Sequence, residues 1–413
     1  MNVWKIIIAI ILLAGLGVAI AFGYVWYIES KEGATQTTQG IAVGEPSPVG
    51  DSVVSSATTT ITESVVEFEK NVAVTPDDQY QYGAFCRVDQ IPNQDNFLVT
   101  FGGSNRDVQA LNAGSPFGGA EGGNGYSYKI YDSNFEYEDR TGVVHNGGGD
   151  AASVMADGYY YFLIGTPPRN WIIEKFDPST MMVVDSVVIE MDKDKEILND
   201  MMLAYANGNI IASGLYDASG TVGGDQKKSD PTAGMATHYH TFDTDLNFKE
   251  RFVLDDVPHI NGSYVVFANN KYNVITSTAF FGDLIVMQYD SDWNFISSKV
   301  LDEDAQWSQG ALFDDATGRF YVAFLDIPLT ADNKIVRGKS IDVVLGIFDQ
   351  DWNLIEKVNV TGLTPADMKN PGRPSVVLVD GKLYVSYDVS TASQLGQSEN
   401  MDWQCTVDIF EVK

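Results

Sequence analysis

Short runs of β-branched and aromatic residues alternate with turns rich in Asp, Asn and Gly along most of the chain. Residues 263–301 show one complete unit: the run SYVVFA, the turn NNK, the runs YNVITSTAF and DLIVMQY, the turn DSDWN and the run FISSKVL. Apolar runs of this length, bounded by such turns, predict β-strands. The unit therefore predicts a four-stranded antiparallel sheet, whose strands we call A to D in chain order.

An aromatic residue followed by Asp marks the end of strand C in successive units. These aromatic residues are Tyr131, Phe176, Phe242, Tyr289 and Phe348, and Phe410 takes the sixth place. Their spacing of about 45 to 66 residues suits a four-stranded propeller blade with loops of varying length. We therefore predict an all-β fold, and the repeat over residues 64–413 resembles that of six-bladed β-propellers.

The sixth unit has only three strands before the chain ends. Residues 64–74, SVVEFEKNVAV, are the candidate for the missing strand, because FEKNVAVT is similar to LIEKVNVTG of the fifth unit. A first strand that pairs with the last blade would close the ring and remove the exposed edges of an open sheet.

The N-terminus has a different pattern. Residues 6–28 carry no charge, and about 20 apolar residues suffice for a helix to cross a bilayer. Trp4, Trp26 and Tyr27 stand at the ends of this run, where the headgroups lie. We predict a transmembrane helix within residues 1–28 that acts as a signal anchor, a Ser/Thr/Gly/Pro-rich linker over residues 29–63, and a propeller outside the cell on a single-pass membrane protein. A signal peptide cleaved near Ala19-Ile20-Ala21 is the alternative.

The charge balance limits the partners. The 413 residues include 56 acidic and 26 basic side chains, for a net charge of -30. Such a surface repels phosphate backbones, so we expect no nucleic-acid partner.

Cys86 and Cys405 fall in neighbouring blades at the closure and are a candidate disulfide, with two buried thiols as the alternative. Asn261 and Asn359 stand in glycosylation patterns.

The C–D turns repeat the phrase D-x-D-x-N, which begins like a calcium-binding loop. A calcium loop needs Gly at the sixth place and Glu at the twelfth. Here the sixth place holds Phe or Leu, and the twelfth holds Leu254, Leu301 or Val360. We therefore interpret the phrase as a structural turn, in which Asp and Asn side chains bond to nearby backbone groups.

The long loops gather at one face of the predicted ring. The A–B and C–D turns are minimal, whereas the B–C loops include residues 102–125, 217–236, 326–340 and 389–403. Long loops on a rigid scaffold often carry function, so this face is the predicted binding surface for a glycan or protein, with tolerated insertions as the alternative.

Strand A lines the channel of a propeller, so polar residues at its start converge at the channel mouth. Asp150, Asp200 and Arg373 are the candidate catalytic residues. The candidate binding residues are Asn199, Asn261, Gln309, Asn370, His145, His259 and Trp307. The alternative is that these residues cap strands and hold water in the channel.

The stretches DAASVMADGYYYFL and NDMMLAYANGNIIA resemble strand starts of furanosidase-type glycoside hydrolases. This resemblance implies a catalytic base at Asp150 and a partner at Asp200. Gly262, however, stands where those enzymes place a Glu, and they have five blades.

His238 and His240 lie on one face of a strand C. With no third ligand nearby in the sequence, we interpret them as a structural pair rather than a zinc site.

Three functions follow from these observations. The first is a membrane-tethered recognition, adhesion or scaffold module that needs no cofactor. The second is a carbohydrate-active hydrolase or lyase at the channel mouth, where a divalent cation such as calcium could bind. The third is a subunit of a cell-surface assembly built through the N-terminal helix, with homo-oligomers as one form.

Overall fold

The computed structural model describes residues 64–75, 80–105, 126–145, 151–166, 170–192, 195–196, 201–217, 235–257, 259–278, 282–303, 305–328, 340–364, 367, 369–394 and 397–413. The predicted anchor and linker lie outside these ranges. Within them, no helix has both the length and the apolar character needed to cross a membrane.

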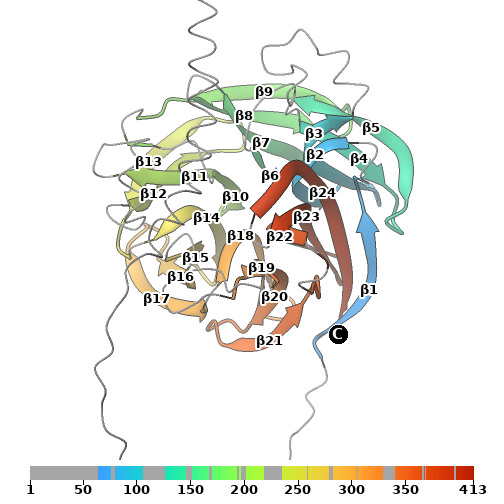
Figure 1. Ribbon diagram of the computed structural model, residues 1–413. Helices are drawn as coiled ribbons and strands as arrows, with labels where there is room; N and C mark the ends of the chain where they lie inside the picture. The colour runs from blue at the N-terminus through green and yellow to red at the C-terminus, as the bar shows by residue number, and fades with distance from the viewer. Residues whose placement is uncertain are drawn as a thin grey trace, which may run out of the picture. The chain divides into compact units, whose positions relative to one another are not determined.

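The described strands form six antiparallel sheets of four strands each, arranged in a ring (Figure 1). The chain is therefore a six-bladed β-propeller, as its repeat predicts. Blades one to three comprise β2 (Tyr80–Gln90), β3 (Phe97–Asn105), β4 (Tyr126–Tyr131), β5 (Tyr137–His145), β6 (Ala151–Ala156), β7 (Tyr159–Thr166), β8 (Asn170–Asp177), β9 (Met182–Ile189), β10 (Met202–Ala206), β11 (Asn209–Asp217), β12 (Met235–Phe242) and β13 (Phe248–Leu254). Blades four to six comprise β14 (Ile260–Ala268), β15 (Lys271–Ser277), β16 (Leu284–Tyr289), β17 (Phe295–Asp302), β18 (Ala305–Asp314), β19 (Arg319–Asp326), β20 (Asp342–Phe348), β21 (Leu354–Asn359), β22 (Lys369–Val379), β23 (Lys382–Gln394), β24 (Gln397–Val412) and β1 (Val66–Ala73).

The first strand closes the ring, which confirms the prediction for residues 64–74. β1 pairs antiparallel with β24, from Val66 opposite Val412 to Ala73 opposite Thr406, and the two strands lie side by side in Figure 1. A bulge between Phe68 and Lys70 shifts the register. The pairing joins the two ends of the propeller, so that the last blade gains a fourth strand and an open edge is removed.

The hydrophobic core is divided among the blade interfaces. Six buried clusters lie within the described residues, and the buried side chains of each come from two neighbouring blades. The second and third strands of a blade are buried on both faces, as in β15 and β20, whereas the outer strand β17 is largely exposed. This explains why the run VVLGIF of β20 is apolar throughout, while the outer strands carry charges.

The D-x-D-x-N phrases are structural turns. In each, the first Asp accepts backbone N–H groups two and four residues on, and the Asn amide donates to its other oxygen. The three turns are built on Asp243 with Asp245 and Asn247, Asp290 with Asp292 and Asn294, and Asp349 with Asp351 and Asn353. These hydrogen bonds hold the pKa of each first Asp below its ordinary value.

A large apolar residue in each of these turns packs between two neighbouring blades. Leu246, Trp293 and Trp352 have φ near +60°, a backbone conformation that residues other than Gly, Asn and Asp rarely adopt. The conformation turns each side chain inward. Trp352 is 2% exposed, stacks on Phe320 of its own blade at 3.9 Å and donates a hydrogen bond to Asn273 of the preceding blade. Packing between blades thus sustains the strained backbone.

Candidate functional site

A cavity of about 400 Å³ occupies the propeller channel and is the first candidate site. All six innermost strands, β2, β6, β10, β14, β18 and β22, contribute to its lining. The lining residues lie towards the C-terminal ends of these strands, next to the short A–B turns. The cavity therefore belongs to the short-turn end of the channel.

Arg87 and Asp89 of β2 are two of the three charged residues that line this cavity, and Asp315 is the third. Arg87 is only 5% exposed, and its guanidinium donates to the carbonyl of Cys86 at 3.0 Å. Burial raises the pKa of Asp89 to about 7, because the hydrogen bond with Tyr160 and the charge of Arg87 offset only part of the desolvation. Tyr264, from the fourth blade, lines the same cavity. This pair was not predicted from the sequence, although two charges at alternate positions of an innermost strand were a usable signal.

Arg373, predicted from sequence as a catalytic residue, lies at the ring closure. It has a φ of 49°, forms an ion pair with Asp388 at 2.9 Å, and is sandwiched between the rings of Phe85 and Trp403. Asp388 is fully buried and also accepts the backbone N–H of Phe85. These contacts tie blade six to blade one.

Two of the predicted binding residues are buried. Asn370 of β22 is 5% exposed. His259 is fully buried, with Nδ1 2.7 Å from the carbonyl of Val257 and Nε2 2.6 Å from the hydroxyl of Thr237. Asp150, Asp200 and Asn199 lie outside the described residues, as do the side chains of Asn261, Gln309, His145 and Trp307. Their convergence at the channel mouth stays a prediction.

The remaining sequence features lie at the closure and the outer edge. Cys86 of β2 and Cys405 of β24 form a disulfide with Cα atoms 5.2 Å apart. The two strands belong to blades one and six, which pack face to face, so strands at different positions in their sheets come within reach. Asn359 is exposed at the end of β21, and its side-chain oxygen accepts the N–H of Gly362.

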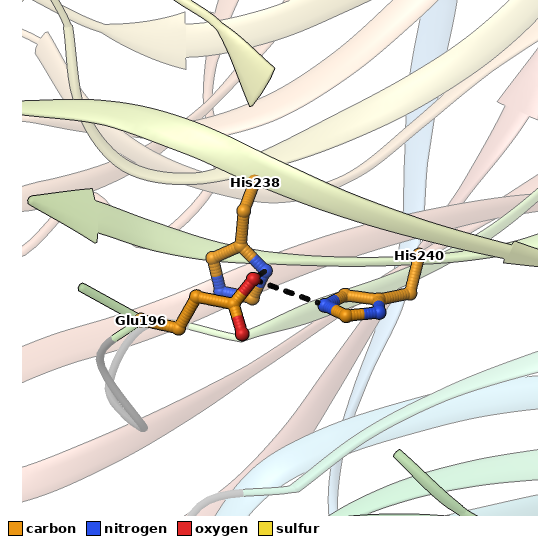
Figure 2. Close-up of side chains that lie close together, drawn as sticks. All are labelled: Glu196, His238 and His240. Carbon is orange, nitrogen blue, oxygen red and sulfur yellow. Dashed lines mark hydrogen bonds and ion pairs between the residues drawn. The ribbon is translucent and has the colours of Figure 1, made fainter. Parts of the chain in front are cut away.

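A second cluster joins His238 and His240 to a carboxylate that the sequence analysis did not connect with them (Figure 2). Glu196 precedes blade three and forms an isolated bridge with Tyr216 of β11. Its Oε1 lies 3.3 Å from Nδ1 of His238 and 3.3 Å from Nε2 of His240. All three side chains are buried. No third ligand lies near the two histidines in the sequence, but the fold supplies Glu196, because an irregular segment about forty residues earlier in the chain packs against β12.

The protonation states of this cluster suit metal binding. Burial lowers the pKa of His238 to about 3, so its ring is neutral at physiological pH. Burial is the largest single influence on Glu196 and opposes its charge, but the hydrogen bond with His240, the two imidazoles and the N–H of Asp192 together outweigh it and hold the pKa of Glu196 below its ordinary value. Arg251 of β13 also contacts Oε1 of Glu196 at 2.7 Å, and Oε2 accepts the N–H of Asp192. The chain therefore holds a carboxylate and two imidazoles that could bind a metal ion.

Comparison with known proteins supports the fold. No protein-family model matches the chain, and no curated protein matches its sequence. A protein of unknown function from Dyadobacter fermentans is similar over 84% of this chain and 100% of its own, with 10% identity and a TM-score of 0.57. A neuraminidase-like protein from A/little yellow-shouldered bat/Guatemala has 7% identity and a TM-score of 0.47, covering 84% and 99% of the two chains. A luciferin-regenerating enzyme has 11% identity and a TM-score of 0.45, covering 82% and 94%. At 10% identity, the similarity to the Dyadobacter protein shows the fold alone.

Proposed function

We propose that this propeller is a recognition module that binds a small polar ligand, of the saccharide class, in its central channel. The observation that carries this proposal is a buried Arg87 beside a half-buried Asp89 in a cavity of about 400 Å³. A cavity of this size suits a small ligand, and polar groups in the lining can fix the orientation of that ligand.

The rest of the lining favours a ring-shaped ligand. Tyr205, Tyr264, Phe267 and Phe313 come from three different blades and offer aromatic surfaces around the polar pair. A sugar presents apolar C–H faces and hydroxyl edges, which match aromatic rings and charged hydrogen-bonding groups. Because Arg87 supplies a buried cation, we expect an acidic sugar to bind more tightly than its neutral counterpart.

Binding of glucuronate and glucose to the full chain tests this proposal. We expect glucuronate to bind, Arg87→Met to weaken it at least tenfold, and Tyr205→Ala to weaken it without disturbing the fold, because Tyr205 is exposed at the cavity rim. Calorimetry gives the affinities, and circular dichroism checks folding. Replacing residues 106–125 by a short Gly-Ser segment is the matched control. If the loop replacement abolishes binding while Arg87→Met and Tyr205→Ala preserve it, recognition belongs to the long-loop face. If neither sugar binds, the channel proposal fails.

A hydrolase with its acid in this channel is the second candidate, and Asp89 favours it. A carboxyl group whose pKa is near 7 is protonated often enough at neutral pH to act as a general acid. The same preparations, assayed for hydrolysis of nitrophenyl glycosides, separate the two functions: an enzyme loses turnover in Asp89→Asn but keeps binding, whereas a recognition module hydrolyses nothing.

We also propose that residues 1–28 attach the protein to the cell membrane. The uncharged run in the sequence supports an anchor, and the linker would present the propeller outside the cell. Assembly through the apolar N-terminal segment is compatible with both functions.

A further inference from the structure

We infer that Glu196, His238 and His240 form a binding site for a divalent transition metal of the zinc class, separate from the channel. Zinc sites in proteins use ligand sets of two imidazole nitrogens and one carboxylate oxygen, with water as a fourth ligand. Calcium and magnesium prefer oxygen ligands alone, so the two histidines disfavour those ions. The site is built by blade three and the segment that leads into it.

The spacing of the three ligand atoms fits one metal ion. In a tetrahedral site with metal–ligand bonds of about 2.0–2.1 Å, neighbouring ligand atoms lie about 3.3–3.4 Å apart. Both His–Glu196 separations here are 3.3 Å, and all three atoms lie within 4.8 Å of one another. Figure 2 shows both rings hanging from the same strand towards the Glu196 carboxylate. Little movement is needed for the three to share an ion.

His238 gives an independent reason to expect a ligand. Its side chain is fully buried, and neither ring nitrogen makes a hydrogen bond within the described part of the protein. A buried polar group without a partner is destabilising, and a bound ion or water is one of the explanations for such a group. A metal bound at Nδ1 would satisfy that nitrogen.

Packing holds His238 in the orientation that a metal requires. Trp171 of β8 stacks on its ring with centroids 4.9 Å apart. On the other side, Gly214 of β11 leaves room for both rings, because a Cβ there would overlap Trp171 and lie 2.9 Å from Nε2 of His238. The neighbours therefore close off Nε2 and direct Nδ1 towards Glu196.

Arg251 gives the competing interpretation, in which the cluster is a metal-free ion pair. Its guanidinium contacts Glu196 Oε1 at 2.7 Å, the atom that would face the metal. Arg251 is on the outer strand β13, with 37% of its side chain exposed, so it can swing into solvent when an ion binds. Its positive charge competes with the metal for Glu196. The two interpretations therefore predict opposite roles for Arg251.

Titration of the full chain with Zn²⁺ after dialysis against a chelator tests the inference. We expect one ion per chain, and a fall in affinity of at least ~100-fold in Glu196→Gln and in His240→Gln, because the loss of a direct ligand exceeds the 10–100-fold effect of an outer-shell partner. Arg251→Gln should raise the affinity. Asp290→Asn, in a D-x-D-x-N turn, is the matched control and should leave binding unchanged.

The histidine signals give a second readout that does not depend on a variant that folds. The chain has only four histidines, so their imidazole resonances can be followed one by one. Zn²⁺ should shift the signals of His238 and His240 and leave His145 and His259 in place. Co²⁺ should give the visible absorption of a tetrahedral site. Absence of stoichiometric binding, shifts confined to His145 or His259, or equal binding by wild type and a folded Glu196→Gln would overturn the site.

Discussion

The D-x-D-x-N turns and the Glu196–His238–His240 cluster both group ligand-type side chains, but their surroundings are opposite. In the turns, the carboxylate of Asp290 is exposed and accepts hydrogen bonds from the backbone of its own loop and from Asn294. In the cluster, the groups are buried and come from two separate segments, and His238 makes no hydrogen bond within the described residues. In a motif of short spacing, neighbouring backbone and side-chain groups can supply all the hydrogen bonds of a carboxylate. In a site built from distant segments, a side chain can keep an unused nitrogen or oxygen with which to bind a ligand.

The largest expected change in stability comes from replacing the tryptophan of a D-x-D-x-N turn. Trp352→Ala should lower the free energy of unfolding by about 3–5 kcal/mol, as expected for a buried aromatic side chain. It removes the stack on Phe320 and the hydrogen bond to Asn273. Urea denaturation followed by circular dichroism measures the change, and Leu354→Ala, at a residue that is 51% exposed, is the control. An Asp349→Ala variant that is less stable than Trp352→Ala would show that the carboxylate dominates the turn.

A smaller effect is expected for the carboxylate of the same turn. Asp349→Ala removes hydrogen bonds that water can replace, so its effect on stability should be well below that of Trp352→Ala. The hydrogen bonds with Asn353 lower the pKa of Asp349. The stabilisation is therefore fully present above the unfolded pKa of about 3.8 and is lost as pH falls below it. Denaturation at pH 7 and near pH 2 measures the difference, which should shrink in acid; a constant difference would contradict this cause.

The smallest effect should come from removing the unpaired histidine of the cluster. In the presence of a chelator, His238→Leu should change the free energy of unfolding by less than about 1 kcal/mol or stabilise the protein, because the lost ring makes no hydrogen bond within the described structure. His259→Leu is the matched control and should cost about 1–3 kcal/mol, since both of its ring nitrogens are paired. Denaturation curves measure both. A large loss in His238→Leu alone would mean that the ring stabilises the metal-free fold.

The repeat carried enough information to predict the fold. Tyr289 and Phe348 are followed by turns that place the next strand beside the last, so local pattern sets the order of strands within each blade. The closure was also predictable, because the C-terminal blade lacked a strand and residues 64–74 matched one. The left-handed φ of Trp293 and Trp352 was not, since it depends on packing against the preceding blade.

The candidate sites were less accessible to sequence reasoning. His238 and His240 were recognised as a pair, but Glu196 lies in an irregular segment with no motif around it. Arg373 carries a charge at the start of an innermost strand, which suggested chemistry. In the structure it pairs with Asp388 and packs between two aromatic rings at the closure.

The sequence by itself determined the strands, their antiparallel order and the number of blades, because hydrophobic periodicity and turn chemistry act between residues close in the chain. The tertiary structure alone decided which polar groups meet: Arg87 with the channel, Arg373 with Asp388, and Glu196 with His238 and His240. These meetings depend on how neighbouring blades pack and on the paths of irregular connections, and no local pattern encodes a distance between segments that lie far apart in the chain.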